Sequence, residues 1–512
     1  MNGVEWELKA GLAHADWAAV RRRVARQAGP GQRRRLLTRY FDTPDGALEA
    51  QGIALRWRTG GRGQALLSVK AGRRALGGFQ RSDEREFPWP QRTIRVADLP
   101  DSEWRRRLVG LVGEAPLVER FATRVERWTF RLARPEAEVE LAFDRGRIEA
   151  GARIQPISEV EFELLAGAPE ALFKLAAELL GGLPAELDLP NKADRGAALA
   201  RGTPWVPAPR ASRPPTPARK VPAGDAFART LALLTEALAA NLSVTHATDD
   251  PEGPHQLRVA LRRLRTTLWL YRPILEPDCA KALIDKARHL GRVVAEVRDA
   301  DVQAEDWLLP RADPSLAEAI DAWRNRARAR VRSALAHEQA TAFAIRLMEL
   351  SVTGGWQRSG ARTALAAPVG ELVEPRIGQL WRRIRKRGAR LGVMSAAERH
   401  EFRKRLKKLR YALELAPADP TGRRFIQGLR ALQDDLGTLN DLAVLEGLAI
   451  DLGEPERNAA LAELVARLRA ERRAEADRLL GRACRHWTRL AGLSPLPSRA
   501  PDARPMPAAP SP

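Results

Sequence analysis

The 512-residue sequence predicts an α+β domain at the N-terminus, followed by an all-α domain. Residues 1–201 alternate apolar and polar side chains in short runs bounded by Gly, Pro and Asp, which is typical of strands. Residues 223–493 are rich in Leu, Ala and Arg and repeat with the period of an α-helix, which predicts a helical domain. Residues 202–222 contain seven prolines and predict an extended linker. Residues 494–512 have a similar composition and predict a disordered tail.

The charge balance of the chain points to a polyanionic partner. There are 86 Lys and Arg residues against 64 Asp and Glu residues, giving a net charge of +22. Such an excess favours nucleic acid, an anionic membrane surface or a phosphate polymer. The two cysteines, Cys279 and Cys484, fit a reducing cytosol rather than a disulfide framework. Because no apolar run approaches the roughly 20 residues that span a bilayer, and the charged start has no signal-peptide pattern, we expect a soluble, cytoplasmic protein without a membrane partner.

The predicted N-terminal strands carry charge on a face where a core would normally lie. Side chains alternate along a strand, so Glu5, Glu7 and Lys9 share one face and Trp6 and Leu8 the other. The alternation recurs around Arg56 and Arg58, Glu84 and Glu86, Glu138, Glu140 and Asp144, and Glu159, Glu161 and Glu163. One such strand could simply face solvent. Segregation into acidic and basic strands instead favours a closed barrel around a cation and a polyanion, because carboxylates bind Mg²⁺ or Mn²⁺ while Arg and Lys bind phosphate.

Several short motifs follow one another in a defined order through residues 1–201. They are Glu5-x-Glu7-x-Lys9, Tyr40-Phe41-Asp42-Thr43-Pro44, Leu48, Ala54-Leu55-Arg56-Trp57-Arg58, Ser68-Val69-Lys70, Arg81 with Glu84 and Glu86, Arg124 with Arg127, Asp144, the Glu159–Glu163 strand and Asn191-Lys192-Ala193-Asp194-Arg195-Gly196. This ordered set resembles the CYTH, or triphosphate tunnel metalloenzyme, superfamily, although that family usually has Ser where Asn191 stands. The resemblance implies an eight-stranded antiparallel β tunnel that binds a triphosphate and one or two divalent metals.

The resemblance also implies roles for individual residues. The implied metal ligands are Glu5, Glu7, Asp144, Glu159, Glu161 and Glu163, and the register of the last strand leaves the choice among its three carboxylates open. The implied triphosphate clamps are Arg56, Arg58, Lys70, Arg124, Arg127 and Lys192. Lys9 would clamp the substrate or orient the attacking water, and it forms the implied catalytic group with Glu5 and Glu7. Such a site acts mainly by positioning and charge neutralisation, so it needs no Ser, Cys or His nucleophile.

The predicted helical domain contains an internal repeat. His255, Arg258, Arg262 and Arg265 form one stripe of a helix, next to an apolar stripe of leucines. The stripe recurs 145 positions later in His400, Arg403, Lys407 and Arg410. Two helical halves of related sequence are the simplest explanation. Residues 376–410 carry 14 Arg or Lys against two Glu, a density that repels itself unless an anion binds.

The repeat, together with the Arg298-Asp299-Ala300-Asp301 and Leu439-Asn440-Asp441 segments, resembles the CHAD domain, the histidine-containing α-helical domain often found behind a CYTH domain. The resemblance implies polyphosphate binding along both stripes. The expected binding residues are His255, Arg258, Arg262, Arg263, Arg265, His400, Arg403, Lys407, Lys408 and Arg410. A neutral imidazole would donate to phosphate, with metal ligation or a pH switch as the alternatives. Residues 310–375 match poorly, so their helix boundaries stay open.

The function expected from these features is metal-dependent hydrolysis of inorganic triphosphate, with Mg²⁺ or Mn²⁺ as cofactor and polyphosphate, including its storage granules, as partner. An adenylate cyclase or a thiamine triphosphatase would share the phosphate site and differ around the leaving group. A second class is a non-enzymatic polyphosphate-granule protein, against which the intact acidic strands argue. Nucleic acid is disfavoured as partner, because the helical stripes lack the interleaved aromatic residues that stack on bases.

Overall fold

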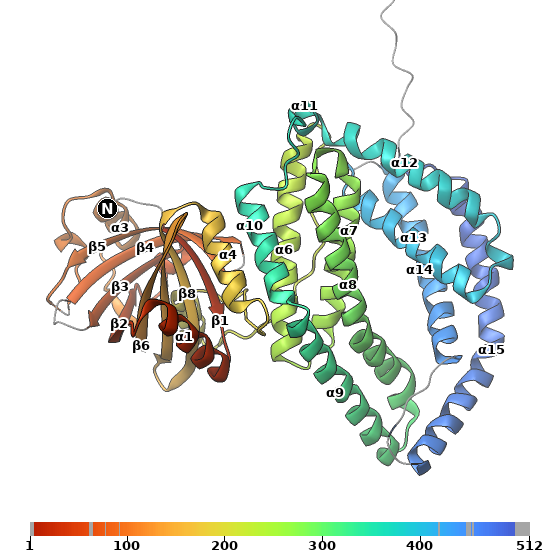
Figure 1. Ribbon diagram of the computed structural model, residues 1–512, viewed down its shortest axis with the longest axis horizontal. Helices are drawn as coiled ribbons and strands as arrows, with labels where there is room; N and C mark the ends of the chain where they lie inside the picture. Colours follow the sequence, from red (N-terminus) through yellow and green to blue (C-terminus); the bar gives the residue numbers. More distant parts are fainter. Residues whose placement is uncertain are drawn as a thin grey trace, which may run out of the picture.

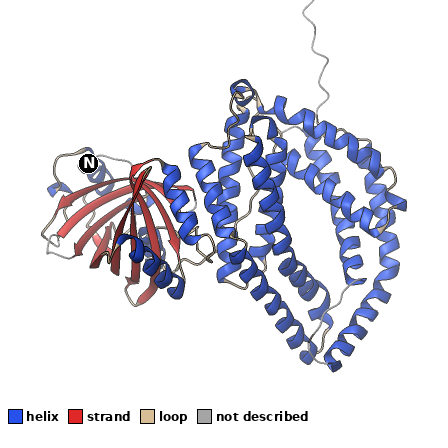
Figure 2. Cartoon of the chain, in the orientation of Figure 1, coloured by secondary structure: helices blue, strands red, loops and turns tan. Residues whose placement is uncertain are grey.

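The computed structural model describes residues 5–60, 65–76, 78–91, 93–417, 420–446, 452 and 455–496 (Figure 1). The predicted division into a strand-rich first part and a helical second part is confirmed, as Figure 2 shows. Most of the predicted tail, residues 497–512, lies outside the described residues. No described helix is both long and apolar enough to cross a membrane.

Eight antiparallel strands form a closed barrel in the N-terminal domain, in the order β1-β5-β4-β3-β2-β6-β7-β8. The strands are β1 (Glu5–Gly11), β2 (Gln32–Asp42), β3 (Ile53–Gly60), β4 (Ala65–Leu76), β5 (Phe79–Pro88), β6 (Val118–Arg134), β7 (Ala137–Ala150) and β8 (Arg153–Gly167). Pairing of β1 with both β5 and β8 closes the ring. This confirms the eight-stranded antiparallel barrel that the sequence predicted.

The apolar core of the barrel domain lies mainly outside the ring, under surrounding helices. Leu8, Phe143 and Phe162 are fully buried beneath α1 (His14–Ala28) and α4 (Pro169–Leu180). Trp57 and Leu67 pack under α2 (Ala47–Ala50), η1 (Val96–Asp98) and α3 (Glu103–Val112). Because strand side chains alternate, an apolar outer face directs the intervening charged residues inward. The charged face inferred from the sequence is therefore the barrel interior.

One end of the barrel interior is packed by α5 (Lys192–Ala200). Leu199 on this helix joins Tyr40, Phe121 and Ile148 in a small apolar cluster. At Gly196 the helix comes so close to Phe121 that an added Cβ would lie 2.0 Å from its ring. The helix starts at an N-cap, Asn191, whose side chain accepts a hydrogen bond from the Asp194 amide at 2.7 Å. Lys192 is thereby held at the edge of the interior.

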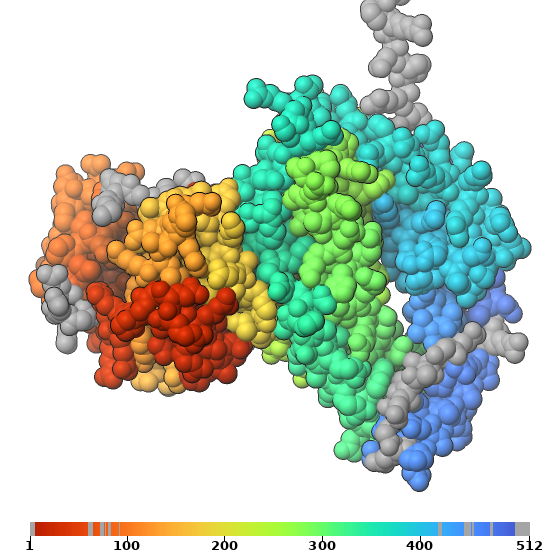
Figure 3. All heavy atoms as spheres, in the orientation of Figure 1, coloured from red at the N-terminus to blue at the C-terminus, as the bar shows by residue number. Residues whose placement is uncertain are grey.

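The second domain consists of two sets of long helices that meet at α7 and α13 (Figure 1). The first set contains α6 (Ala223–Ala247), α7 (Glu252–Leu270), η2 (Arg272–Ile274), α8 (Pro277–Val302), η3 (Gln303–Leu308), η4 (Leu309–Arg311), α9 (Pro314–His337) and α10 (Ala340–Thr353). The second contains α12 (Val369–Gly388), η5 (Leu391–Val393), α13 (Ala396–Glu414), α14 (Pro420–Glu446) and α15 (Pro455–Ala491), with α11 (Arg362–Ala366) between the sets. Figure 3 shows an opening between α8 and α14, where the two sets diverge.

The two domains share a packed seam formed by α4 and α10. The Thr341 hydroxyl donates to the Leu183 carbonyl at 2.5 Å across it. Gly181 lies so close to Ala342 that an added Cβ would be 2.9 Å from the alanine Cβ. Apolar residues of the outer barrel and of the helices form one continuous buried cluster through this seam.

The proline-rich segment has no regular structure, as expected for an extended linker, but it is docked on both domains. The Trp205 carbonyl accepts from Gln155 at 2.8 Å on the barrel. The Arg210 backbone forms two hydrogen bonds with the buried side chain of Asn241 on α6, at 3.0 and 2.8 Å. Ser212 is fully buried. These contacts depend on residues distant in the sequence, so composition alone could not reveal them.

Candidate active site and basic helical surface

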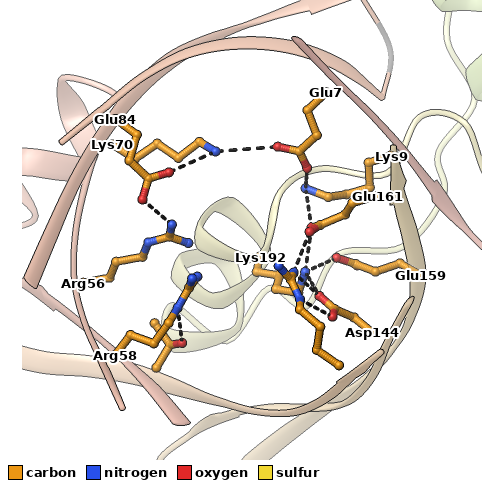
Figure 4. Close-up of polar contacts among 12 residues, drawn as sticks. Glu7, Lys9, Arg56, Arg58, Lys70, Glu84, Asp144, Glu159, Glu161 and Lys192 are labelled. Carbon is orange, nitrogen blue, oxygen red and sulfur yellow. Dashed lines mark hydrogen bonds and ion pairs between the residues drawn. The ribbon is translucent and has the colours of Figure 1, made fainter. Parts of the chain in front are cut away.

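The barrel encloses a cavity of 620 Å³ lined by charged side chains. Of the residues predicted for the site, it is lined by Glu7, Lys9, Arg56, Arg58, Lys70, Arg127, Glu161, Glu163 and Lys192. Figure 4 shows that the side chains labelled there, among them Arg56, Arg58, Glu161 and Lys192, come from opposite walls and point toward one another. The alternation along each strand and the closure of the ring are sufficient to bring them together.

One wall is mainly basic. The Arg56 Nε donates to the Ser68 hydroxyl at 2.7 Å, and its guanidinium pairs with Glu84. Among the described residues, Arg58 donates a side-chain hydrogen bond to the Thr38 hydroxyl, at 3.4 Å, and none of their carboxylates forms an ion pair with it. The nearby charge of Arg56, burial and the charge of Arg127 lower the pKa of Arg58 to about 10. A cation without a compensating carboxylate in a cavity is well suited to bind an anion.

The opposite wall carries three carboxylates, from Asp144, Glu159 and Glu161, whose ligand oxygens lie within 4.8 Å of one another. Lys192 contacts all three, with Nζ–O distances of 2.6 Å to Asp144 and 2.7 Å to Glu161. Arg127 donates to both oxygens of Asp144, at 2.7 and 2.6 Å, and to Glu161 at 2.6 Å. Burial alone would raise the pKa of Glu161, but Lys192, Arg127 and Lys9 hold it well below its usual value. The group therefore stays ionised, as a cation site requires.

Lys9 and Lys70 connect the two walls. The Lys9 amino group lies 3.2 Å from Glu7 and 3.3 Å from Glu161. Lys70 lies 3.6 Å from Glu7 and 3.4 Å from Glu84. Burial opposes ionisation of Glu7, yet Lys9, aided by Lys70 and Lys192, lowers its pKa. The cavity thus holds paired opposite charges around a ring, which a bound cation and anion can rearrange.

Two residues predicted for the site, Arg124 and Glu5, are not placed in the cavity by the structure. Arg124 points away from the cavity and pairs with Glu149 on the outer face at 2.9 Å. Its position is three residues from Arg127 on one strand, and an odd separation places side chains on opposite faces. The expectation that both arginines clamp the same ligand is therefore corrected for Arg124. The backbone of Glu5 pairs with Ser82, but the Glu5 side chain lies outside the described part of the chain.

No role in the site was expected for Glu84 or Arg195. Glu84 faces Lys70 across the β4–β5 pair, and Arg56 lowers its pKa to about 2 against the opposing effect of burial. Its alternation with Glu86 was visible in the sequence, but its partner depends on strand register. Arg195 is 3% exposed and pairs with Glu159. It lies one helical turn after Lys192, and this spacing was the available signal.

In the helical domain, the structure brings the predicted stripes of α7 and α13 together. Arg263 on α7 pairs with Glu414 on α13 at 2.8 Å. Arg263 and Arg410 flank the Tyr411 ring, each with its guanidinium carbon 5.1 Å from the ring centroid. His400 is exposed and hydrogen-bonds to Asn440 on α14. The repeated stripes therefore form one surface.

In the middle of this surface, the positively charged side chains outnumber the carboxylates that pair with them. Burial, then Arg403 and Arg262, lower the pKa of Lys407 to about 6. Burial and the neighbouring Arg258 lower the pKa of Arg262 to about 10. Arg258 pairs with the carboxylate of Asp299 at 2.7 Å. Burial and Arg298 also lower the pKa of His255, which favours its neutral form. Crowded cations of this kind are stabilised by a bound anion.

Comparison with known proteins matches each domain to a family. Residues 4–195 match the CYTH domain and residues 229–450 match the CHAD domain. The inorganic triphosphatase of Haemophilus influenzae is 30% identical over 166 residues, which cover 31% of this chain and 44% of that protein. The chain therefore spans less than half the length of this curated relative.

Two solved structures are also similar. The CHAD domain from the plant Ricinus communis is 26% identical, with 54% of this chain and 96% of that chain covered and a TM-score of 0.44. A Hippeastrum protein described as an adenylyl cyclase with a dominant triphosphatase activity is 22% identical, with 40% and 98% covered and a TM-score of 0.30.

Fold and site together define a protein in which a closed barrel with a charged interior precedes a basic helical bundle. Residues 4–195 form a CYTH domain, and residues 229–450 form a CHAD domain behind it. The resemblance inferred from the ordered motifs and the helical repeat is confirmed.

Proposed function

We propose that this chain is a divalent-metal-dependent inorganic triphosphatase whose helical domain binds inorganic polyphosphate. The observation that carries the proposal is the opposition of two features in one cavity. Arg58 has no carboxylate partner among the described residues, and it faces three clustered carboxylates across the barrel. Such a pair of features suits an anion and a hard cation bound side by side. The triphosphatase activity of the Haemophilus influenzae relative supports the same reading.

The basic wall would bind the triphosphate. Arg56, Arg58 and Lys70 line the cavity together and offer several donors to phosphate oxygens. Arg127 would join them from β6, while Lys192 would bind from the end closed by α5. Because burial places these cations in a medium of low dielectric, they stabilise developing phosphate charge more than they would in water.

The acidic wall fits a hard divalent cation, because it offers three carboxylates with their oxygens close together. Asp144, Glu159 and Glu161 would hold the ion, with Glu7 and Glu163 near enough along the cavity to contribute. A bound Mg²⁺ or Mn²⁺ would neutralise phosphate charge and activate water. Lys9, between Glu7 and Glu161, is positioned to orient a water against the terminal phosphate. Hydrolysis would break the bond between that phosphorus and its bridging oxygen, releasing orthophosphate and pyrophosphate.

The α7–α13 surface would bind polyphosphate through its crowded cations. Arg258, Arg262, Arg403 and Lys407 supply charge, and a neutral His255 can donate one hydrogen bond. A phosphate polymer offers evenly spaced negative charges along one direction, which suits a helical stripe. This partner would also place the chain on polyphosphate granules in the cytoplasm.

The test is phosphate release from triphosphate, ATP, thiamine triphosphate and long-chain polyphosphate, each with Mg²⁺, Mn²⁺ or a chelator, with cyclic AMP followed in parallel. Wild type should hydrolyse triphosphate best and lose activity with the chelator. Glu161→Gln should lower release about a hundredfold or more, because it removes one of three clustered carboxylates, while polyphosphate binding persists.

Glu149→Gln is the matched control, since this carboxylate belongs to the same barrel but lies on its outer face with Arg124 and Arg147. It should retain wild-type activity. Full turnover in Glu161→Gln, or faster formation of cyclic AMP than of phosphate, would contradict the proposed enzyme function.

A further inference from the structure

A second cavity, of 390 Å³, lies in the helical domain beside the short helix η2. Its lining consists of Arg272, Pro273, Pro277, Arg358 and Arg376. Three of these residues are arginines and none is acidic. The cavity lies beyond the C-terminal end of α7, outside the set of residues that the sequence repeat assigned to polyphosphate.

Backbone contacts hold the arginines of this cavity in place. The Arg358 amide donates to the Ile274 carbonyl at 3.0 Å, and Leu275 pairs with Gln357 in an isolated bridge. These bonds fix the Arg358 segment against η2, which carries Arg272. Arg376 comes from α12 and donates to the Trp269 carbonyl at 2.9 Å. Three separate segments therefore converge on one arginine-lined site.

The positive charge of the site is not balanced within the described part of the chain. No ion pair involves Arg272, Arg358 or Arg376 there. The neighbouring carboxylate of Glu276 instead accepts a hydrogen bond from the Cys279 amide at 2.9 Å and caps α8. The Nε of Arg376 is buried without a hydrogen-bond partner. An anion in the cavity would supply the missing negative charge.

The site continues the basic stripe of α7. Arg258, Arg262, Arg265 and Trp269 follow one another at spacings of four or three residues, which keeps them on one side of α7, and Arg272 in η2 comes two residues after the helix ends. At about 1.5 Å per residue, the line from Arg258 to Arg272 is roughly 20 Å long. Trp269 lies between the α7–α13 surface and the cavity. Its ring centroid is 3.7 Å from the Lys408 Nζ and 5.2 Å from the guanidinium carbon of Arg376.

We propose that Arg272, Arg358 and Arg376 form an outer subsite that receives the continuation of a polyphosphate chain bound on the α7–α13 surface. The inference rests on the proposed polyphosphate function and adds a length requirement to it. A triphosphate is too short to span the line from Arg258 to Arg272, whereas a long chain can occupy both ends at once. The subsite therefore raises affinity for long chains and leaves that for short chains unchanged.

The experiment compares the full chain with the double variant Arg272→Gln/Arg358→Gln. Both side chains are exposed, so neutralising them leaves the core intact. Binding of long-chain polyphosphate and of tripolyphosphate is measured across a salt series. Long-chain affinity should fall about tenfold, and its dependence on salt should become shallower by roughly one to two units of log K per log salt. Tripolyphosphate affinity should stay at the wild-type value.

Arg326→Gln/Arg467→Gln is the matched control, with the same loss of charge at exposed positions on α9 and α15. It should bind both ligands as wild type does. An equal loss in this control, or no long-chain loss in Arg272→Gln/Arg358→Gln, would overturn the subsite. Duplex DNA that binds wild type as tightly, with the same loss in the variant, would assign the site to polyanions in general. If wild type binds no polyphosphate, the proposed function itself fails.

Discussion

Arg124 and Arg127 differ in one respect, the side of the barrel wall that they face. Arg127 lies inside with Asp144 and Glu161, and Arg124 lies outside with Glu149. The strand and the residue type are the same for both. The pair therefore separates the effect of charge inside the cavity from the effect of charge on the domain.

Arg127→Gln should slow triphosphate hydrolysis about a hundredfold, because it removes a buried donor from the cavity. Arg124→Gln should leave turnover unchanged, since its partner is on the surface. Steady-state phosphate release with both variants at saturating metal checks the assignment. Equal losses in the two variants would show that the arginines act through stability rather than through the ligand.

From the lowered pKa of Lys407 we expect the protein to take up a proton when it binds polyphosphate. Its pKa is lowered to about 6, first by burial and then by Arg403 and Arg262, so it is mostly neutral at pH 8. A bound anion favours the charged form and raises this pKa, hence binding at pH 8 takes up a proton and weakens as the pH rises. Because the folded pKa lies below the unfolded value of about 10.4, the same group makes folding stability rise with pH from about 6 to about 10.

Titration calorimetry at pH 8 in two buffers of different ionisation enthalpy measures the uptake. Lys407→Met should remove most of it. An unchanged uptake in this variant would place the titrating group elsewhere, for example at His255, whose pKa is also lowered by burial and nearby arginines.

At the level of single residues, sequence patterns predicted the cavity better than they predicted its contacts. Alternation, the segregation of acidic from basic strands and the family resemblance together identified Glu7, Arg58 and Glu161 as members of one charged interior. Arg124 and Arg127 were expected to clamp one ligand because the family motif contains both, although their odd separation already places them on opposite faces of a strand. Glu84 escaped assignment because its contacts with Lys70 and Arg56 depend on the register of three strands.

Among the elements, α5 is the one whose position most directly controls the site. It carries Lys192 into the carboxylate cluster, and it can lie there only because Gly196 allows contact with the Phe121 ring. Any larger residue at this position must displace the helix or the ring.

Gly196→Ala should destabilise the barrel domain by about 1–3 kcal/mol through overpacking. Gly110→Ala on α3 is the control, because nothing lies within 4 Å of its added Cβ. It should stabilise by about 0.5–1 kcal/mol, as alanine favours helix over glycine. Urea unfolding of the full chain compares the two. A neutral Gly196→Ala would mean that α5 can shift at no cost.

The elements predicted with most detail were those with a strong period. The apolar stripe of α7, including Leu257, Leu261 and Leu264, is buried as its spacing indicated. Residues 310–375 could not be divided in advance, and they contain the end of η4, then α9, α10 and α11, and the start of α12. The reason is physical: α10 packs against both α6 and the barrel helix α4, so it lacks a single polar face.

For the whole molecule, the α4–α10 seam joins the two domains into one packed body. Ala342 faces Gly181 across this seam, with space for little more than the methyl group. Arg210 of the proline-rich segment forms ion pairs with both domains. Its guanidinium nitrogens lie 3.1 Å from a carboxylate oxygen of Glu236 on α6 and 3.8 Å from one of Asp188 in the barrel domain. We therefore expect the barrel and the first helical set to unfold together.

Ala342→Arg should split this unfolding into two transitions, because a long charged side chain cannot be buried against Gly181 without separating the helices. Ala322→Arg adds the same side chain at an exposed position of α9 and should leave unfolding unchanged. Scanning calorimetry records the number of transitions. A single transition in Ala342→Arg would show that the seam does not couple the domains.

Sequence analysis could predict two domains and the order of their folds, but not how they join. The seam is made by short contacts of small residues, Gly181, Thr341 and Ala342, which carry no distinctive pattern. The docking of residues 202–222 likewise depends on Asn241, whose role is visible only once α6 is in place.

Closure of the barrel determines where the chain can begin to aggregate. A ring gives every strand two partners, so it exposes no edge onto which a strand of another chain could add. Among the described residues the shortest pairing is that of β1 with β5, with four residue pairs. If the ring opens there, it frees two strand edges and brings the charged lining into contact with solvent. Self-association of partly unfolded molecules should therefore begin at β1 and β5, and a cation on Glu7 bound together with a polyanion on Lys70 should suppress it.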